Sequence, residues 1–283
     1  MVLESIIFPM KAEKKPWEMF FIGFLYSTVA VFLSLWIFEK QASFIMVFLT
    51  VMACVPIMYN TMRLEESKEL TIKDEGKLMR EHTKAIAFYL FLFLGITIST
   101  LLWYVVLPSG TVAFLFQKQV QTISDINNQI SGNIVGSVGL FIKILFNNVK
   151  VMVFCLIFSF IYGAGAIFIL TWNATVIGAA MGSFIRSHIS NYAATVGITK
   201  LANYFHAVSL GVLRYSLHGI PEVLAYLYAG LVGGIVSAAL IKKDINSKNL
   251  MNLLVDTSDL LLLSLAFLLL GAVLEVYVTP LLF

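Results

Sequence analysis

The chain contains little charge. Of its 283 residues only 12% are Asp, Glu, Lys or Arg, while 59% are hydrophobic and the mean hydropathy is +0.90. A soluble globular domain carries about 25% charged residues, so this composition excludes one and indicates a polytopic membrane protein. The net charge is only +3 and no basic run is interleaved with aromatic residues, so we expect no nucleic-acid partner. The expected partner is the lipid bilayer.

Cysteine is nearly absent as well. The only two cysteines, Cys54 and Cys155, lie inside separate apolar runs. Thiols in such positions behave as small hydrophobic core residues, and two of them do not indicate a disulfide or a metal site. We therefore expect neither a metal nor a cofactor.

The common enzyme signatures are missing too. His218 is followed by Gly-Ile-Pro-Glu, so there is no His-Glu-x-x-His, and there is no Gly-x-Ser-x-Gly either. The sequence has neither paired intramembrane aspartates nor a Gly-rich phosphate loop with a lysine. We expect a protein without catalytic activity.

Long apolar runs, in contrast, are abundant. A helix needs about 20 residues to cross the roughly 30 Å of membrane hydrocarbon. A short seventh run, 174–189, is needed to bring the chain back to the correct side, with Trp172 and Asn173 as the turn of a tight helical hairpin. The sequence therefore predicts an all-α transmembrane bundle of about six to seven spans with broken or re-entrant helices. The predicted spans are 19–38, 42–62, 85–107, 151–171, 174–189, 223–241 and 260–282.

The basic residues predict how the chain is oriented. Three lie in the N-terminal tail, six in the segment 63–84 and three in the linker after residue 241. All of these positions share one side of the membrane in the predicted topology. Because Lys and Arg accumulate on the cytoplasmic side, we expect a multi-pass protein of the cell membrane with a cytoplasmic N-terminus.

The chain is interpreted as a single integral membrane domain, 1–283. Residues 1–84 form an N-terminal helical hairpin and a charged cytoplasmic segment, and residues 85–283 form the helical core. The charged part, 63–84, has six basic and six acidic residues and is expected to be a water-exposed helical extension. His82 lies within it and is expected to be solvated.

Several polar residues are expected to interrupt the helices. Pro108 ends the third span. The segment 140–146 is apolar around Lys143 and is expected to lie in the membrane interface as an amphipathic elbow, with Asn147 and Asn148 at the bend into the fourth span.

Two later segments carry similar expectations. The segment 191–217 has too many polar groups for a lipid-facing span and could form a re-entrant element. Ser258 and Asp259 are expected to cap the last helix at its start.

The stretch from His218 to Glu222 places ionisable and helix-breaking residues against an apolar run. Proline is favoured at the first position of a helix, so Pro221 is expected to begin one, and Gly219 and Pro221 argue against a continuous helix. Glu222 would then lie in the first turn, where the helix dipole stabilises a carboxylate.

A second carboxylate, Glu275, lies inside the last apolar run. Glu222 and Glu275 fall on the same side of the membrane because the last two spans are antiparallel. The seven-span topology also maps Arg186, His188, Arg214 and His218 to that side. These residues could neutralise one another as a structural Arg–Glu pair, or they could form a proton, ion or metal site.

Small residues recur at a spacing that lets helices approach closely. They favour packing within the molecule, with a homo-oligomer interface as the alternative. The residues are Gly178 and Gly182, Gly230 and Gly234, and Gly163 and Gly165.

Several of these motifs occur in an order that resembles a known family. The residues are Asn147, Asn148, Lys150 and Val151, then Gly163, Gly165, Asn173 and Gly178, then His218 to Glu222 with Ala229, Gly230, Gly233 and Gly234, and last Leu274 to Pro280. Over this range the chain resembles the stage II sporulation protein M family. The segment 9–66 resembles the form found in family members outside spore-forming bacteria.

The resemblance implies a membrane scaffold. In spore-forming bacteria such a protein gathers peptidoglycan-remodelling proteins during engulfment. We therefore expect a non-catalytic scaffold or assembly protein with protein partners in a membrane complex. The alternative is a channel or transporter for an ion or small solute, with the charged residues lining a cavity and the helix breaks forming the pathway.

Overall fold

The structure is a computed structural model that describes residues 15–72, 74–131, 136–162, 165–191, 197–241 and 247–283. All regular secondary structure in these ranges is helical, which confirms the predicted fold class. Seven helices are long and apolar enough to cross a membrane, in agreement with the predicted number of spans. These helices are α2 (Glu18–Ile37), α3 (Ala42–Thr71), α4 (Glu75–Val106), α7 (Ser137–Tyr162), α8 (Ala166–Asn191), α9 (Gly197–Ile241) and α10 (Ser247–Val273).

Shorter helices complete the described chain. A 3-10 turn, η1 (Glu39–Gln41), joins α2 to α3, and these two helices pack against each other. The third span ends where expected, at Pro108, and is followed by α5 (Ser109–Leu115) and α6 (Gln117–Ser131). A π-helical segment, η2 (Leu274–Val278), and α11 (Thr279–Leu282) continue α10 to the C-terminus.

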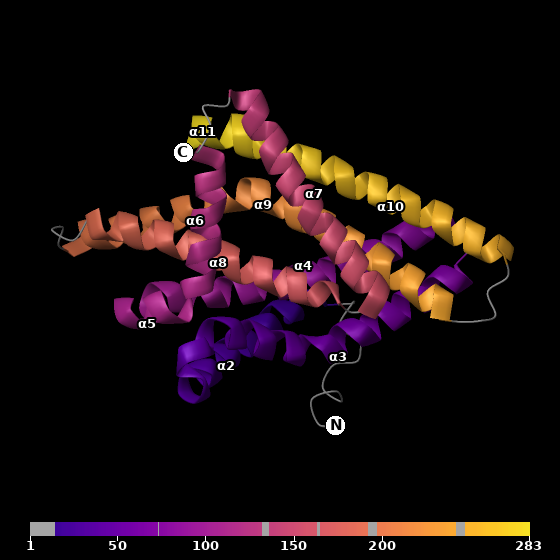
Figure 1. The fold of residues 1–283 in the computed structure, drawn as a ribbon, viewed down its shortest axis with the longest axis horizontal. Helices are drawn as coiled ribbons and strands as arrows, with labels where there is room; N and C mark the ends of the chain where they lie inside the picture. Colours follow the sequence, from indigo (N-terminus) through magenta and orange to yellow (C-terminus); the bar gives the residue numbers. More distant parts are fainter. Residues whose placement is uncertain (1–14, 73, 132–135, 163–164, 192–196, 242–246) are drawn as a thin grey trace.

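The helices form two packed groups (Figure 1). Helix α4 packs mainly against α2 and α8, and α9 packs mainly against α7 and α10, while α8 also contacts α9 and so joins the groups. Glycines permit the close approach of α2 and α4, because a Cβ on Gly23 or Gly95 would collide with the carbonyl oxygen of Leu92 or Phe20. This arrangement leaves α7, α8, α9 and α10 around the polar residues described below.

The fourth and fifth spans form a hairpin whose turn is not at Trp172. Helix α7 ends at Tyr162 and α8 begins at Ala166, so Asn173 lies inside α8 and the predicted turn is wrong. The side chain of Asn173 donates from Nδ2 to the carbonyl oxygen of Ile169 at 2.8 Å. An amide that bonds to its own helix needs no break in the chain, and both helices therefore have full membrane-spanning length.

The predicted elbow before the fourth span is also wrong. Helix α7 is continuous from Ser137, so the segment 140–146 belongs to the span, and Asn147 and Asn148 do not mark a bend. The fourth span begins at Ser137, fourteen residues before the predicted start at residue 151. The polar residues in the middle of α7 face a cavity instead of lipid.

Helix α9 continues through the residues that were expected to break it. It runs for 45 residues and contains Pro221, so neither Gly219 nor Pro221 begins a helix. A proline inside a helix costs about 3 kcal/mol, and transmembrane helices tolerate it because their neighbours satisfy the freed backbone group. The part of the predicted re-entrant segment from residue 197 onward is ordinary helix, and residues 192–196 lie outside the described ranges.

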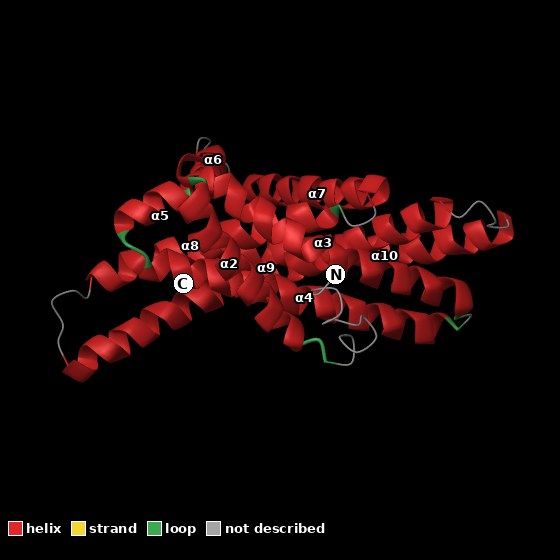
Figure 2. Cartoon of the chain, turned by 90° about the horizontal axis from the view of Figure 1, so that it is seen from below, coloured by secondary structure: helices red, strands yellow, loops and turns green. Residues whose placement is uncertain are grey.

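Two helices project beyond the rest of the bundle at one end. Helices α8 and α9 extend together beyond the other helices at one end, which Figure 2 shows at the left.

Helix α10 begins at Ser247, so Ser258 and Asp259 lie inside it and do not cap the last helix. The charged segment 63–84 continues α3 to Thr71 and starts α4 at Glu75, so these parts of it are helical, but Glu65 and His82 within it are buried and not exposed to water as expected.

Candidate functional site

The main polar feature of the bundle is a cavity of about 500 Å³, here called the central cavity. It lies between α7, α8, α9 and the π segment that follows α10. Its wall contains two carboxylates, two lysines, a histidine and three asparagines. The polar residues are Lys143, Asn147, Asn148, Lys150, Asn173, His218, Glu222, Tyr226 and Glu275.

A hydrogen-bonded chain holds one carboxylate in place. Asn148 of α7 donates from Nδ2 to Oε1 of Glu222 on α9 at 2.6 Å. The hydroxyl of Tyr226, one helical turn further along α9, donates to Oδ1 of Asn148 at 3.1 Å. The asparagine thus uses both ends of its amide to link two helices and to orient the carboxylate.

Glycine allows the last span to lie directly against this carboxylate. A Cβ added to Gly271 of α10 would lie 2.9 Å from Cγ of Glu222 and 3.4 Å from the carbonyl oxygen of His218. Any larger residue at this position would push Glu222 away. The position of Glu222 is therefore fixed by α7 on one side and α10 on the other.

The second carboxylate lies on an irregular turn. Glu275 is in the π-helical segment Leu274–Val278, where the hydroxyl of Thr279 donates to the carbonyl oxygen of Leu274 at 2.9 Å. The same hydroxyl lies 3.5 Å from Nδ1 of His218. Single π turns inside α-helices are frequent at functional sites because they change the direction of nearby side chains.

Helix α7 supplies positive charge to the same cavity. Lys143, Asn147 and Lys150 are spaced by four and by three residues along one continuous helix, and all three line the cavity. Lys143 is half-buried, whereas Asn147 and Lys150 are exposed. A charged side chain exposed near the middle of a span faces a hydrated space or costs about 3 kcal/mol or more.

The structure divides the cluster expected from the sequence. Glu222, Glu275 and His218 lie together in the central cavity. Arg214 is on the same continuous helix, four residues before His218, but its guanidinium stacks over the ring of Phe184 at 5.2 Å. Among the described residues, no ion pair connects an arginine to either carboxylate of the cavity.

Arg186 and His188 lie elsewhere. Arg186 donates to the carbonyl oxygen of Tyr104 at 3.0 Å and to the hydroxyl of Ser109 at 2.9 Å, so it closes the C-terminal end of α4. Nδ1 of His188 lies 2.9 Å from the carbonyl oxygen of Phe184, and the rings of the two residues lie against each other with centroids 3.9 Å apart. Neither residue lines the central cavity.

The predicted small-residue contacts occur inside the molecule where they are described. A Cβ on Gly178 or Gly182 of α8 would collide with Thr100 or Tyr104 of α4, and one on Gly230 of α9 would lie 2.9 Å from Cβ of Ala166. Gly165 packs in the same way against the carbonyl of Phe158. Gly234 is buried on the same helix as Gly230, and Gly163 lies outside the described residues.

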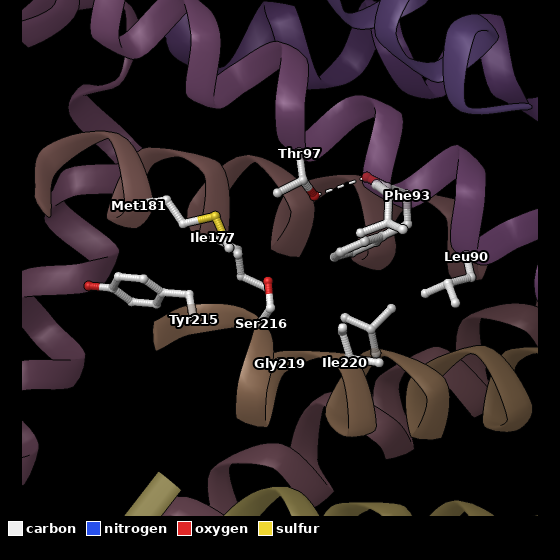
Figure 3. Close-up of a pocket in the computed structure, with 11 residues that line it drawn as sticks. Leu90, Phe93, Thr97, Ile177, Met181, Tyr215, Ser216, Gly219 and Ile220 are labelled. Carbon is white, nitrogen blue, oxygen red and sulfur yellow. Dashed lines mark hydrogen bonds between the residues drawn. The ribbon is translucent and has the colours of Figure 1, made fainter. Parts of the chain in front are cut away.

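Gly219 borders a second, apolar space. A cavity of about 30 Å³ lies between α4, α8 and α9, and nothing lies within 4 Å of a Cβ placed on Gly219. Figure 3 shows this space between Phe93 and Thr97 on one side and Gly219 and Ile220 on the other. It holds no charged residue, so Gly219 leaves room in the packing and does not break the helix.

A second group of charges, here called the α3–α4 ion cluster, lies outside the cavity. The carboxylate of Glu65 on α3 is fully buried and accepts from Lys68 at 2.6 Å, and it lies 2.8 Å from Nδ1 of His82 on α4. Lys68 also lies 3.5 Å from Glu81. His82 is only 2% exposed, so the expectation that it is solvated is wrong.

No metal-binding geometry is found in the described part of the chain: no three His, Cys, Asp or Glu residues there lie close enough to hold an ion. Cys54 and Cys155 are free and buried. The groups of the central cavity are instead a mixture of hydrogen-bond donors, acceptors and both signs of charge. Such a wall suits a small polar or charged solute.

Three cavity residues were not identified as site residues from the sequence. Lys143 was assigned to an interfacial elbow, and Lys150 lay just before the fourth span, which was expected to start at residue 151. Their spacing with Asn147 on one helical face was the available signal. Tyr226 gave no signal, because a tyrosine in an apolar run is ordinary and only its contact with Asn148 distinguishes it.

A comparison with models of protein families found one that matches most of this chain. The family model described as stage II sporulation protein M matches residues 85–280, which is over two thirds of the chain. The chain belongs to the stage II sporulation protein M family. Searches of the curated proteins and of the solved structures found no match to it.

The family match separates the two groups of charges. It begins at the residue after the charged segment and contains every residue that lines the central cavity. The α2–α3 hairpin and the α3–α4 ion cluster, from Glu65 to His82, precede it. The resemblance seen from residue 147 onward is therefore part of a longer match, and the resemblance of the segment 9–66 is not included in it.

Proposed function

We propose that this member of the stage II sporulation protein M family is a non-catalytic membrane protein whose core binds an ion or small polar solute on a pathway across the bilayer. The observation that carries the proposal is the central cavity of about 500 Å³, with two carboxylates and two lysines between membrane-spanning helices. Pockets for small molecules have volumes of about 300–1,000 Å³.

The energetic argument supports a function in binding. A charged group at the centre of a span costs about 3 kcal/mol or more, and a purely structural role would repay that cost with ion pairs. Glu222 is bonded to a neutral amide, and Glu275 has no hydrogen bond or ion pair to a described residue. Charges that are left available in a cavity are those that a ligand can use.

The backbone supports the same function. Solute sites of transporters lie near the membrane centre and are formed by interrupted helices. The π segment Leu274–Val278 interrupts the last span beside Glu275, whereas α9 is continuous through Pro221 and Glu222. One of the two carboxylates therefore lies at an irregular position of its helix.

The proposal is tested with Glu222→Gln and Glu275→Gln in purified full-length protein, with Glu18→Gln as a surface control. Thermal unfolding is measured first, and then the flux of protons, monovalent cations and amino acids in liposomes. We expect flux in the wild type that is reduced at least about tenfold in the two cavity variants, which retain their stability. Absence of flux in the wild type, with a loss of stability in the variants, would contradict a pathway.

A second candidate, a scaffold in a membrane complex, is favoured by the family and by one structural feature. Helix α9 has 45 residues, about twice the number needed to cross a bilayer, so its first turns extend beyond the membrane with α8. Phe205 and Val208 are exposed on this extension at 75% and 40%. Crosslinking from position 205 to a neighbouring protein in native membranes tests it, and the double variant Phe205→Ser and Val208→Ser is expected to abolish the crosslink.

A further inference from the structure

The two signs of charge in the central cavity come from different elements, which form separate parts of its wall. Lys143 and Lys150 project from α7, while Glu222 and Glu275 come from α9 and the π segment. Glu222 bonds to Asn148, and the neighbours of Glu275 in the π segment pack against Ile144, so both carboxylates lie at heights on α7 between the two lysines. The lysines are about 10 Å apart along the helix axis.

One carboxylate and one lysine of the cavity, Glu275 and Lys150, do not neutralise one another. Neither Glu275 nor Lys150 has a hydrogen bond or ion pair to any described residue, although both line the same cavity. The two unlike charges therefore border one space of about 500 Å³, where both are available to a bound molecule. A molecule that carries both an ammonium and an anionic group satisfies both walls at once.

The mouth of the cavity has a mixed character. Phe146 and Ile142 line it and are 62% and 48% exposed, on the outer side of α7 where a bilayer would place hydrocarbon. Asn147 is exposed beside them. The opening therefore joins an apolar exterior to a charged interior, which would admit a polar group that is attached to an apolar chain as well as a free solute.

We propose that the central cavity binds a zwitterion, with its ammonium at Glu275 and Glu222 and its phosphate or carboxylate at Lys150 and Lys143. This ligand class rests on the proposed function of the same site. The source of the zwitterion is either a small free solute or the headgroup of a phospholipid that enters through the side of the bundle. His218 and the asparagines supply further hydrogen bonds to either one.

The first test uses free probes on purified full-length protein in dodecyl maltoside. Binding is measured by calorimetry for phosphoethanolamine and glycine, which carry both charges, and for ethanolamine and inorganic phosphate, which carry one. We expect either phosphoethanolamine or glycine to bind at least about tenfold more tightly than ethanolamine or phosphate, because only a zwitterion contacts both the carboxylates and the lysines. Equal affinities for all four probes would contradict a free zwitterion as the ligand.

The second test distinguishes the source. The protein is reconstituted in nanodiscs of phosphatidylglycerol with or without phosphatidylethanolamine, and retained lipids are counted by native mass spectrometry. Selective retention of phosphatidylethanolamine identifies a headgroup site, and binding of the free probes without such retention identifies a solute site. The proposal is overturned if neither free zwitterions nor phosphatidylethanolamine are preferred.

Charge variants assign each wall. Glu275→Gln is expected to reduce zwitterion affinity at least about tenfold and to leave the weak affinity for phosphate unchanged. Lys150→Gln is expected to reduce zwitterion affinity to a similar extent and to leave the weak affinity for ethanolamine unchanged. Lys40→Gln, on the exposed turn between α2 and α3, is the control. Equal affinities of all three variants for zwitterions would overturn the proposal.

The outcomes separate this inference from the proposed function. If a zwitterion binds but nothing crosses liposome membranes, the ligand class stands and the pathway is wrong. If Glu222→Gln or Glu275→Gln abolishes ion flux but no zwitterion binds, the pathway stands and the ligand class is wrong.

Discussion

The protein has two groups of charged residues that are built in opposite ways. In the α3–α4 ion cluster, the fully buried carboxylate of Glu65 has a lysine on one oxygen and a histidine on the other. In the central cavity, Glu222 accepts a hydrogen bond from the neutral side-chain amide of Asn148. Among the described residues Glu222 has no other hydrogen bond or ion pair, and Glu275 has none. The first group fills its own space, whereas the second surrounds an open volume.

The difference indicates what each group is for. Charges that satisfy one another hold helices together, and removing one partner leaves a buried charge uncompensated. Charges that remain available around a cavity contribute little to folding and can bind a ligand. The family match includes only the second group, so the shared part of the chain carries the open site and the N-terminal part carries the closed one.

The largest expected effect concerns the closed group. Glu65→Ala removes the acceptor of both Lys68 and His82 and is expected to lower the free energy of unfolding by about 3–5 kcal/mol. Unfolding is followed with a thiol-reactive dye, because both cysteines are buried in the fold. Glu81→Gln, which touches only the edge of the cluster, is expected to cost less than about 1 kcal/mol. Equal losses in the free energy of unfolding for the two variants would show that the cluster does not depend on Glu65.

An intermediate effect is expected where the open group touches the fold. Asn148→Leu leaves the hydroxyl of Tyr226 and the carboxylate of Glu222 without their partner, and the expected loss of stability is about 2 kcal/mol. Asn147→Leu, at the exposed neighbouring position, is expected to cost less than about 0.5 kcal/mol. Similar melting temperatures of the two variants would show that Asn148 does not orient the carboxylate.

A smaller effect is expected from glycine positions that differ only in their surroundings. Gly271→Ala pushes against Cγ of Glu222 and is expected to cost about 1–2 kcal/mol and to weaken ligand binding. Gly219→Ala enters open space in α9 and is expected to gain up to about 1 kcal/mol. Thermal unfolding of both variants measures the difference, and a stabilising Gly271→Ala would refute the close contact.

The smallest effect on stability is expected at the cavity itself. In Glu222→Gln the new amide oxygen still accepts from Asn148, so the stability is expected to change by less than about 1 kcal/mol while ligand binding and flux fall. Unfolding and flux are measured on the same preparation. A destabilisation as large as that of Glu65→Ala would show that Glu222 is structural like the closed group.

The spans were predictable because they depend on local composition. Apolar runs of about 20 residues indicate membrane helices whatever their neighbours, and Pro108 ends one where the sequence indicates. The errors in the spans concern residues that were taken as helix breaks. Asn173, Asn147 and Pro221 each lie within a continuous helix. Asn173 bonds to its own helix backbone, and Asn147 faces the central cavity.

The site was predictable only in part. The antiparallel order of the last two spans was enough to bring Glu222 and Glu275 together, because topology alone fixes their side of the membrane. The partners of each charge depended on how the helices rotate and cross, which the sequence does not state. Arg186 therefore closes α4 instead of joining the cluster, and His82 is buried against Glu65 instead of being solvated.

The sequence by itself determined that this protein is a membrane helical bundle and that two carboxylates meet in its later spans. Composition and span order are sufficient for that, because lipid requires every backbone group to be satisfied within helices. Only the tertiary structure decided which charges are closed and which are open. That distinction depends on the packing of α7 against α9 and α10, where Gly271 and Asn148 fix one carboxylate and leave a cavity beside it.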